Sequence, residues 1–251
     1  MIRRLQLGTS CLEDLDVRVL DKFLDKSWVH LGDADSVREP RNLSYYYRMF
    51  RGRPLEFIKL VVLRVSGRQP GVQRTTRDPE ELRNSTNFQP FYFKKGDRLP
   101  FDDGSFDYIL SEHFFHHLFF DEAFSLFEEC HRVLKPHGVV RTVVPDADLR
   151  TYSAPEPAGF PDVRMSFTEP LKHKTRYSVY MLSEILRLAG FKPIALRYCD
   201  RHGNHIEKDP AEMGQTYARC PERELVFQLD HVLRLDSLIV DGLKEPAQAR
   251  G

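Results

Sequence analysis

The hydrophobic positions of the chain form short continuous runs that alternate with stretches of helical periodicity. Segments 2–7, 106–110 and 139–144 are short and rich in apolar residues. Short apolar segments of this length predict buried strands. The segments "WVHLGDAD", "FKPIALRY" and "DSLIVDGL" predict further strands.

Three segments repeat apolar residues every three or four positions and therefore predict helices. They span 12–23, 121–134 and 179–189. The second is followed by the stop sequence "KPHG", and the third by Gly190 at its C-terminal cap position. Strands that alternate with helices predict an α/β fold with a mostly parallel sheet, in a single domain over 1–251.

One region interrupts this regular pattern. Residues 36–92 begin with an aromatic and basic stretch, "YYYRMFRGR", and continue with turn formers in "QPGVQRTTRDPEELRNSTNFQP". We interpret 36–92 as an insertion or lid within the domain. The aromatic residues are expected to pack on the domain, with the arginines in water.

Composition and charge restrict the partners that the chain can have. It contains 251 residues, of which 41% are hydrophobic, with 37 basic and 37 acidic side chains. This balance provides no overall attraction to nucleic acid or to an anionic membrane, and no apolar run reaches the ~18 residues of a membrane span. Four scattered cysteines and the missing signal peptide predict a cytoplasmic protein. No pattern indicates the oligomeric state.

The middle of the chain carries a specific motif. "LPFDDGSFDYILSEHFFHHL" is followed by "EECHRVLKPHGVVRTVVPD". These segments resemble class I S-adenosylmethionine-dependent methyltransferases, and in particular the small bacterial predicted methyltransferases. The resemblance is strong over 98–148, and "RRLQLG" and "WVHLGDAD" near the front resemble the first two strands of the family. It continues more weakly through "HKTRYSVYMLSEILRLAGF", "YCDRHGNH" and "SLIVDGLKEP". This continuation implies that His173 lies near the substrate side, and a loop packed on the sheet is the alternative. The resemblance implies a Rossmann-like methyltransferase fold with a doubly wound, mostly parallel, seven-stranded sheet.

The same resemblance implies where S-adenosylmethionine would bind. It places Gly8, Asp33, Asp97 and Ser111 at the carboxyl ends of the strands. A glycine after the first strand lets the backbone approach the cofactor. Acids after the second and third strands would contact ribose and adenine, and Ser111 would face the methyl group. The chain departs from the family in the first loop, where "GTS" replaces Gly-x-Gly.

Three histidines, His113, His116 and His117, follow the fourth predicted strand. They are our candidates for catalysis, because an imidazole with a pKa near ~6.5 can accept a proton from a hydroxyl or amine during methylation. A helix would place His113 and His117 on one face, as metal ligands require, but "HFFHH" contains no second ligand pair, and no metal ligands are assigned. A structural role, with the phenylalanines packed under the sheet, is the third interpretation.

The leading hypothesis is methyl transfer from S-adenosylmethionine to a hydroxyl or amine of a small molecule or glycan. One alternative is a methyltransferase-fold scaffold that has lost standard cofactor binding, as the altered "GTS" loop would allow. Another is a metal-assisted enzyme that uses the His113, His116 and His117 cluster.

Overall fold

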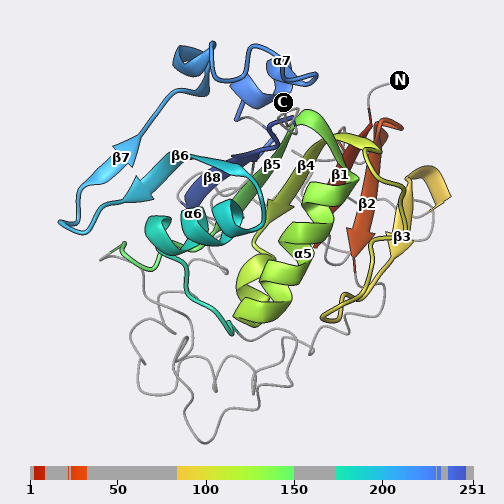
Figure 1. Cartoon of the computed structure of the whole chain (residues 1–251), viewed down its shortest axis with the longest axis horizontal. Coiled ribbons are helices and arrows are strands. Elements are labelled where there is room, and N and C mark those ends of the chain that lie inside the picture. Colours follow the sequence, from red (N-terminus) through yellow and green to blue (C-terminus); the bar gives the residue numbers. More distant parts are fainter. Residues whose placement is uncertain are drawn as a thin grey trace, which may run out of the picture.

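A computed structural model describes residues 3–8, 22, 24–32, 84–149, 173–229, 231–232 and 237–246. Within these ranges the chain folds around one eight-stranded sheet with the strand order β3-β2-β1-β4-β5-β8-β6-β7 (Figure 1). The strands are β1 Arg4–Leu7, β2 Trp28–Gly32, β3 Phe88–Pro90, β4 Phe106–Glu112, β5 Leu134–Val144, β6 Lys192–Cys199, β7 His205–Glu207 and β8 Leu238–Leu243.

The sheet is mostly parallel, as the sequence predicts. Strands β3, β2, β1, β4 and β5 run parallel to one another. Strand β8 pairs antiparallel with both β5 and β6, and β7 pairs antiparallel with β6. The predicted α/β fold is confirmed. The sheet has one strand more than the seven expected, because the short strand β7 extends its edge beyond β6.

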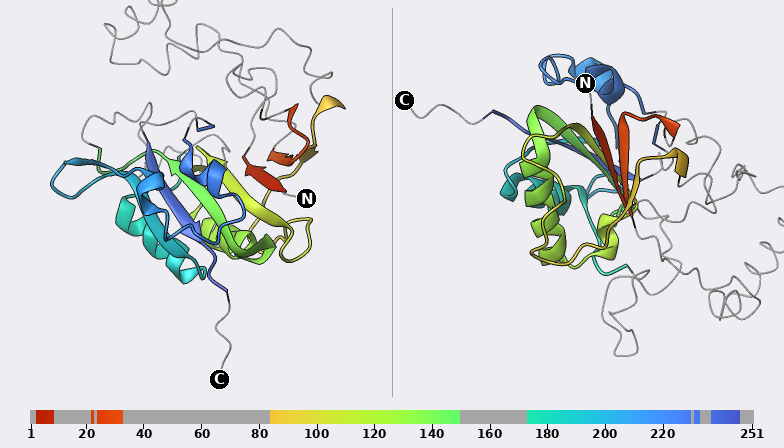
Figure 2. Two further views of the ribbon diagram at one scale, coloured as in Figure 1. Left: turned by 90° about the horizontal axis from the view of Figure 1, so that it is seen from above. Right: turned by 90° about the vertical axis from the view of Figure 1, so that its right-hand side faces the viewer.

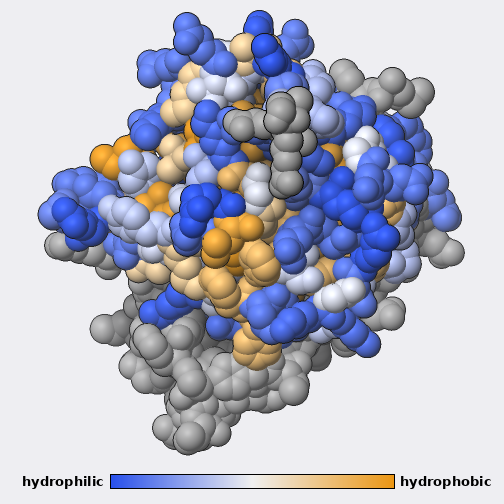
Figure 3. Space-filling view, in the orientation of Figure 1, coloured by the Kyte–Doolittle hydropathy of each residue, from blue (hydrophilic) through white to orange (hydrophobic). Residues whose placement is uncertain are grey.

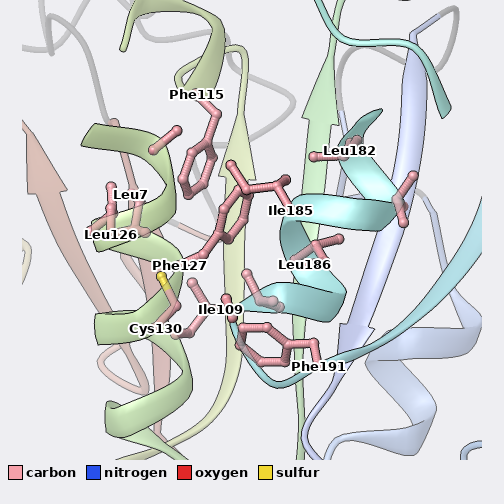
Figure 4. Packing of buried hydrophobic residues seen from close by; sticks show 14 of the residues in the cluster. Leu7, Ile109, Phe115, Leu126, Phe127, Cys130, Leu182, Ile185, Leu186 and Phe191 are labelled. Carbon is pink, nitrogen blue, oxygen red and sulfur yellow. The ribbon is translucent and has the colours of Figure 1, made fainter. Parts of the chain in front are cut away.

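Helices cover both faces of the sheet. On one face lie α5 Phe120–Val133 and α6 Val179–Leu188, and on the other lies α7 Arg223–Phe227 (Figure 2). Two short 3₁₀ helices, η3 Phe115–His117 and η4 Pro210–Met213, complete the described elements. Figure 4 shows the core between the sheet and the helices α5 and α6. Here Phe127 of α5 and Ile185 of α6 pack near Ile109 of β4. This covering of both faces agrees with the doubly wound arrangement.

Local sequence explains where α5 and α6 begin and end. At the start of α5, the Glu122 carboxylate accepts a hydrogen bond of 2.8 Å from the Phe119 backbone N–H. The α6 N-cap is Ser178, whose hydroxyl accepts from Met181 N–H at 3.3 Å. After α6, Gly190 has a φ of 95°, which confirms the predicted glycine stop.

Two predicted boundaries differ from the structure. Strand β5 begins at Leu134, so that "KPHG" belongs to a strand with His137 at a φ of 66° rather than to a separate turn. The helix still ends before Lys135. In the predicted insertion 36–92, residues 88–90 form edge strand β3 beside β2. Apart from residue 22, the predicted helix 12–23 lies outside the described residues, as does most of 36–92.

A buried ion pair joins the two central strands β5 and β8. Arg141 and Asp241 are direct partners across the antiparallel pair, and both are fully buried. The guanidinium donates two hydrogen bonds of 2.8 Å to the carboxylate, and the Tyr217 hydroxyl donates another of 2.8 Å. Arg141 also donates to the carbonyl oxygens of Val226 and Gln228. The pair therefore attaches α7 to the centre of the sheet.

The outer surface of α5 and α6 is partly apolar. Figure 3 shows hydrophobic residues gathered over these helices, where Phe120 and Leu188 are exposed. None of the helices among the described residues combines the length and the apolar character that crossing a membrane requires.

Candidate functional site

The candidate site lies at the carboxyl ends of the parallel strands, at the bottom of the sheet in Figure 1. Strand β4 ends at Glu112, and the histidine segment follows at once. Because β8 runs antiparallel to β5, its first residue pairs with Val144, the last residue of β5. Ser237, directly before β8, therefore reaches the same edge. In open α/β sheets, ligands bind at this edge.

His113 is held in an unusual backbone conformation at this edge. Its φ is 51°, in the left-handed region that few residues other than glycine adopt. Its N–H continues the β4–β5 ladder by donating to Val143 O at 2.8 Å. Its Nε2 lies 2.8 Å from Ser237 Oγ, within hydrogen-bond distance. Conformations of this kind cost roughly 1–3 kcal/mol and concentrate at functional sites.

The other two histidines of the motif join a histidine from a distant segment. The ring centroids of His116 and His173 are 4.2 Å apart, and those of His116 and His117 are 4.1 Å apart. The ring centroids of His117 and His173 are 5.2 Å apart. We call His116, His117 and His173 the histidine triad. Ligand nitrogens of all three lie within 4.8 Å of one another, close enough to approach one metal ion.

Hydrogen bonds join the segment that carries His173 to the segment that carries His116 and His117. The His116 carbonyl accepts from the N–H groups of Lys174 at 2.8 Å and Thr175 at 3.2 Å. The Thr175 hydroxyl donates to the Leu118 carbonyl at 2.7 Å. The segment that carries His173 is therefore tied directly to η3, which carries the other two histidines.

His116 is the buried member of the triad. Only 2% of its surface is exposed. Burial, followed by the nearby His117, His173 and His113, holds the pKa of His116 well below its usual range. His116 is therefore a neutral imidazole near neutral pH, and a neutral imidazole can offer a lone pair to a proton or a metal ion.

The expectation that His113 and His117 share one helix face is wrong. Only residues 115–117 form a helix, and it is a single 3₁₀ turn. His113 precedes it in the left-handed conformation and hydrogen-bonds to Ser237. His117 instead contacts His116 and His173. The motif thus divides into one histidine on the β8 side and two in the triad.

Gly8 follows β1, as predicted, and it closely approaches the histidine segment. Its φ is 74°, which favours glycine. A Cβ atom added at residue 8 would lie 2.3 Å from Phe114 Cβ and 2.4 Å from Phe114 Cγ. The Phe114 side chain therefore occupies the space beside the Gly8 backbone, and only glycine allows this approach.

The other predicted cofactor residues have different surroundings. Ser111, at the end of β4, is fully buried, and its Oγ has no hydrogen-bond partner within the described part of the chain. The Asp97 carboxylate closes its own turn by accepting from Lys94 N–H at 2.8 Å. Asp33 lies outside the described residues. Gly8 and Ser111 thus lie at the carboxyl ends of β1 and β4, whereas Asp97 is engaged in its own turn.

His173 and Ser237 belong to this site, although neither was assigned as a catalytic, cofactor-binding or metal-binding residue from the sequence. His173 is 56 positions from His117, and only the weak continuation of the family motif through "HKTRYSVY" pointed to it. Ser237 lies in "DSLIVDGL", which predicts a strand but no chemistry. Its role depends on the antiparallel pairing of β8, and no local pattern reveals that pairing.

Comparison with known proteins agrees with the motif. Residues 72–142 match the family model described as methyltransferase domain. This range includes β3, β4 and α5 and ends within β5, and it contains all three histidines of the motif. No curated protein matches the chain in sequence at a significant level.

Solved structures give alignments of low identity. One is with a chain of the Haloferax volcanii complex that contains the Trm112 methyltransferase activator, with a TM-score of 0.46, 19% identity, and coverage of 98% of this chain and 83% of that chain. Another is with a SAM-dependent methyltransferase from Methanosarcina mazei, with a TM-score of 0.43, 15% identity, and coverage of 97% and 92%. A third, from Aquifex aeolicus, has a TM-score of 0.41, 17% identity, and coverage of 81% and 78%.

Since these TM-scores are below 0.5, the likeness to methyltransferases rests on the match over 72–142 and on the sheet itself. The matched segment supplies edge strand β3, the inner strand β4 and most of β5, and the other strands of the sheet lie outside it. The predicted resemblance is confirmed: the chain has a Rossmann-like methyltransferase fold, and its residues 72–142 match a methyltransferase domain.

Proposed function

We propose that the chain transfers a methyl group from S-adenosylmethionine to a hydroxyl or amine of a small molecule or glycan, at the carboxyl end of β4. The observation that carries this proposal is His113, held at the end of β4 at a φ of 51° with Nε2 2.8 Å from Ser237 Oγ. A strained, oriented imidazole at the ligand edge of an α/β sheet is suited to proton transfer.

The residues at the edge fit the cofactor in two places. Gly8 has the positive φ that lets backbone approach a ligand, and the buried Ser111 Oγ is available for a hydrogen bond. These two residues would hold S-adenosylmethionine, which supplies an electrophilic methyl group when bound. At Gly8, the Phe114 side chain must turn away to make room.

His113 would accept the proton that the acceptor oxygen or nitrogen releases. Ser237 would hold the imidazole plane in place, since its hydroxyl lies at hydrogen-bond distance from Nε2. Much of the acceleration would come from positioning, because holding the acceptor in attack geometry removes an entropic cost. His117, the second proton-acceptor candidate, belongs to the histidine triad, so we assign this step to His113.

The test is a calorimetric titration of the folded protein with S-adenosylmethionine and S-adenosylhomocysteine. We expect saturable binding of one nucleoside per chain. Incubation with methyl-labelled S-adenosylmethionine and panels of hydroxyl and amine acceptors should then yield S-adenosylhomocysteine. The absence of binding to protein that melts cooperatively would refute the proposal.

One observation favours a second candidate, a methyltransferase-fold scaffold without standard cofactor binding. The Phe114 side chain fills the space beside Gly8, which is the position expected to approach the cofactor. In such a scaffold Phe114 would remain packed at residue 8. The same titration separates the two candidates, because the scaffold binds neither nucleoside.

A further inference from the structure

We further propose that the histidine triad, His116, His117 and His173, binds one divalent transition-metal ion such as Zn²⁺. The ligand nitrogens of the three side chains lie within 4.8 Å of one another. The chain brings them together from two segments that are 56 positions apart in sequence. Neither the family match nor the proposed methyl transfer requires such a cluster.

The scaffold of the triad has the rigidity that a metal site needs. His116 and His117 lie on η3, directly after β4. Three hydrogen bonds from Lys174 and Thr175 to the carbonyls of His116 and Leu118 fix the segment that carries His173. Ligands on elements fixed in this way lose little further freedom when an ion binds.

His116 provides a second, independent observation. Its Nδ1 is buried and has no hydrogen-bond partner within the described part of the chain. Leaving a buried polar atom unsatisfied costs roughly 1–3 kcal/mol, and each such atom calls for an explanation. An ion that accepts its lone pair would provide one.

The ligand type and number indicate the class of ion. Imidazole suits Zn²⁺, Cu²⁺ and Ni²⁺, whereas Mg²⁺ and Ca²⁺ prefer oxygen. With Zn–N distances of ~2.0–2.1 Å, the nitrogens must approach one another more closely than 4.8 Å. Rotation of the half-buried rings of His117 and His173 would bring their nitrogens toward His116. Three protein ligands leave the fourth tetrahedral position open to water or to another oxygen.

The triad adjoins the proposed methyl-transfer site. The ring centroids of His113 and His116 are 5.4 Å apart. An acceptor oxygen in the open position would therefore lie beside His113, and the ion would favour its deprotonated form. This role for the ion rests on the proposed function, whereas ion binding itself does not.

The experiment measures Zn²⁺ binding to the full chain, purified without a histidine tag and stripped with a chelator. Titration against a chromogenic chelator should give one Zn²⁺ per chain with a dissociation constant of about 1 µM or tighter. Co²⁺ in place of Zn²⁺ should give the intense visible absorption of a four-coordinate ion. Weaker binding, or Co²⁺ with only the weak absorption of a six-coordinate ion, would overturn the proposal.

Three variants connect the ion to the triad. His173→Ala and His117→Ala should each weaken Zn²⁺ binding by about 100-fold or more, since loss of an outer-shell partner alone costs 10–100-fold. Both residues are only half-buried, so these variants are expected to fold, as a cooperative thermal melt would verify. His202→Ala is the control, because His202 is exposed in a separate turn. Equal binding by His173→Ala and His202→Ala would refute the site.

The two proposals can fail separately. Zn²⁺ binding that depends on the triad, without nucleoside binding, would leave the metal site standing and refute methyl transfer. Nucleoside binding without Zn²⁺ binding would refute the metal site and leave the proposed methyl transfer standing.

Discussion

His113 Nε2 and Ser237 Oγ lie 2.8 Å apart, although 124 positions of sequence separate the two residues. The contact exists because β8 runs antiparallel to β5 and so begins where β5 ends. It connects the histidine after β4 to the other side of β5. The orientation of His113 therefore depends on β8, the last described strand along the sequence.

We expect His113→Ala to lower methyl transfer by roughly 10²–10⁴, the usual contribution of a general base. Ser237→Ala should lower it by about fivefold to tenfold, since one hydrogen bond of about 1 kcal/mol would be lost. Both variants should bind S-adenosylhomocysteine as the unaltered protein does. Initial rates would compare the turnover of the variants with that of the unaltered protein, and calorimetry would compare their affinities for S-adenosylhomocysteine. Unchanged turnover with a lower melting temperature would instead show that His113 is structural.

Phe114→Ala should strengthen nucleoside binding by about tenfold, equal to ~1.4 kcal/mol, because no ring would have to leave the space beside Gly8. Calorimetry with S-adenosylhomocysteine provides the measurement. Phe101→Ala is the matched control, since Phe101 is also a half-buried aromatic residue, packed on Phe106 at the opposite end of β4. Weaker binding by Phe114→Ala than by Phe101→Ala would show that the ring supports the ligand.

The sequence predicted the elements whose signals are local. The continuous apolar run of β4, the helical repeat of α5 and the glycine after α6 all correspond to observed structure. A run buried on both faces can only be a central strand, so these signals placed the histidine motif at the correct edge. The match over 72–142 also covers β4 and α5.

The sequence could not predict contacts that depend on pairing between distant segments. His173 joins the triad through hydrogen bonds to η3, and Ser237 reaches His113 through the direction of β8. The sequence also did not predict the left-handed conformation of His113, because a histidine in an apolar segment gives no signal for a positive φ. For this reason a helix with His113 and His117 on one face was among the arrangements that the sequence allowed.

Arg141→Met should destabilise the fold by roughly 3–5 kcal/mol, because Asp241 would remain buried with its charge unpaired. Urea denaturation gives the free energy of unfolding. The double variant Arg141→Met with Asp241→Leu should lose considerably less free energy of unfolding, since no charge stays buried. Arg187→Met, which removes an exposed ion pair with Glu184, should have little effect. If Arg141→Met and Arg187→Met lost equal free energy of unfolding, the unpaired charge of the buried Asp241 would not be the cause.

Stability should fall as the pH is lowered from 6.5 toward 4. Burial lowers the pKa of His30 to about 3 and that of His231 to about 2. In the unfolded chain both would titrate near ~6.5, so below that pH the unfolded state binds more protons than the folded state. Each histidine should therefore lower the free energy of unfolding by about 1.4 kcal/mol per pH unit over this window.

This pH dependence can be measured by urea denaturation at a series of pH values. His30→Leu should have a shallower slope than the unaltered protein, whatever its stability at pH 7. His202→Ala, which removes an exposed histidine, should keep the original slope. An identical slope in all three proteins would mean that His30 takes up protons equally in both states.

The position of β8 has a consequence for synthesis on the ribosome. It is the last strand along the sequence, yet it lies between β5 and β6 in the sheet. Until it has emerged from the ribosome, β5 and β6 both lack a neighbour, and two strand edges are exposed to other chains. A nascent chain that stalls before Ser237 would therefore be prone to aggregate, and a chaperone that covers such edges would improve its yield.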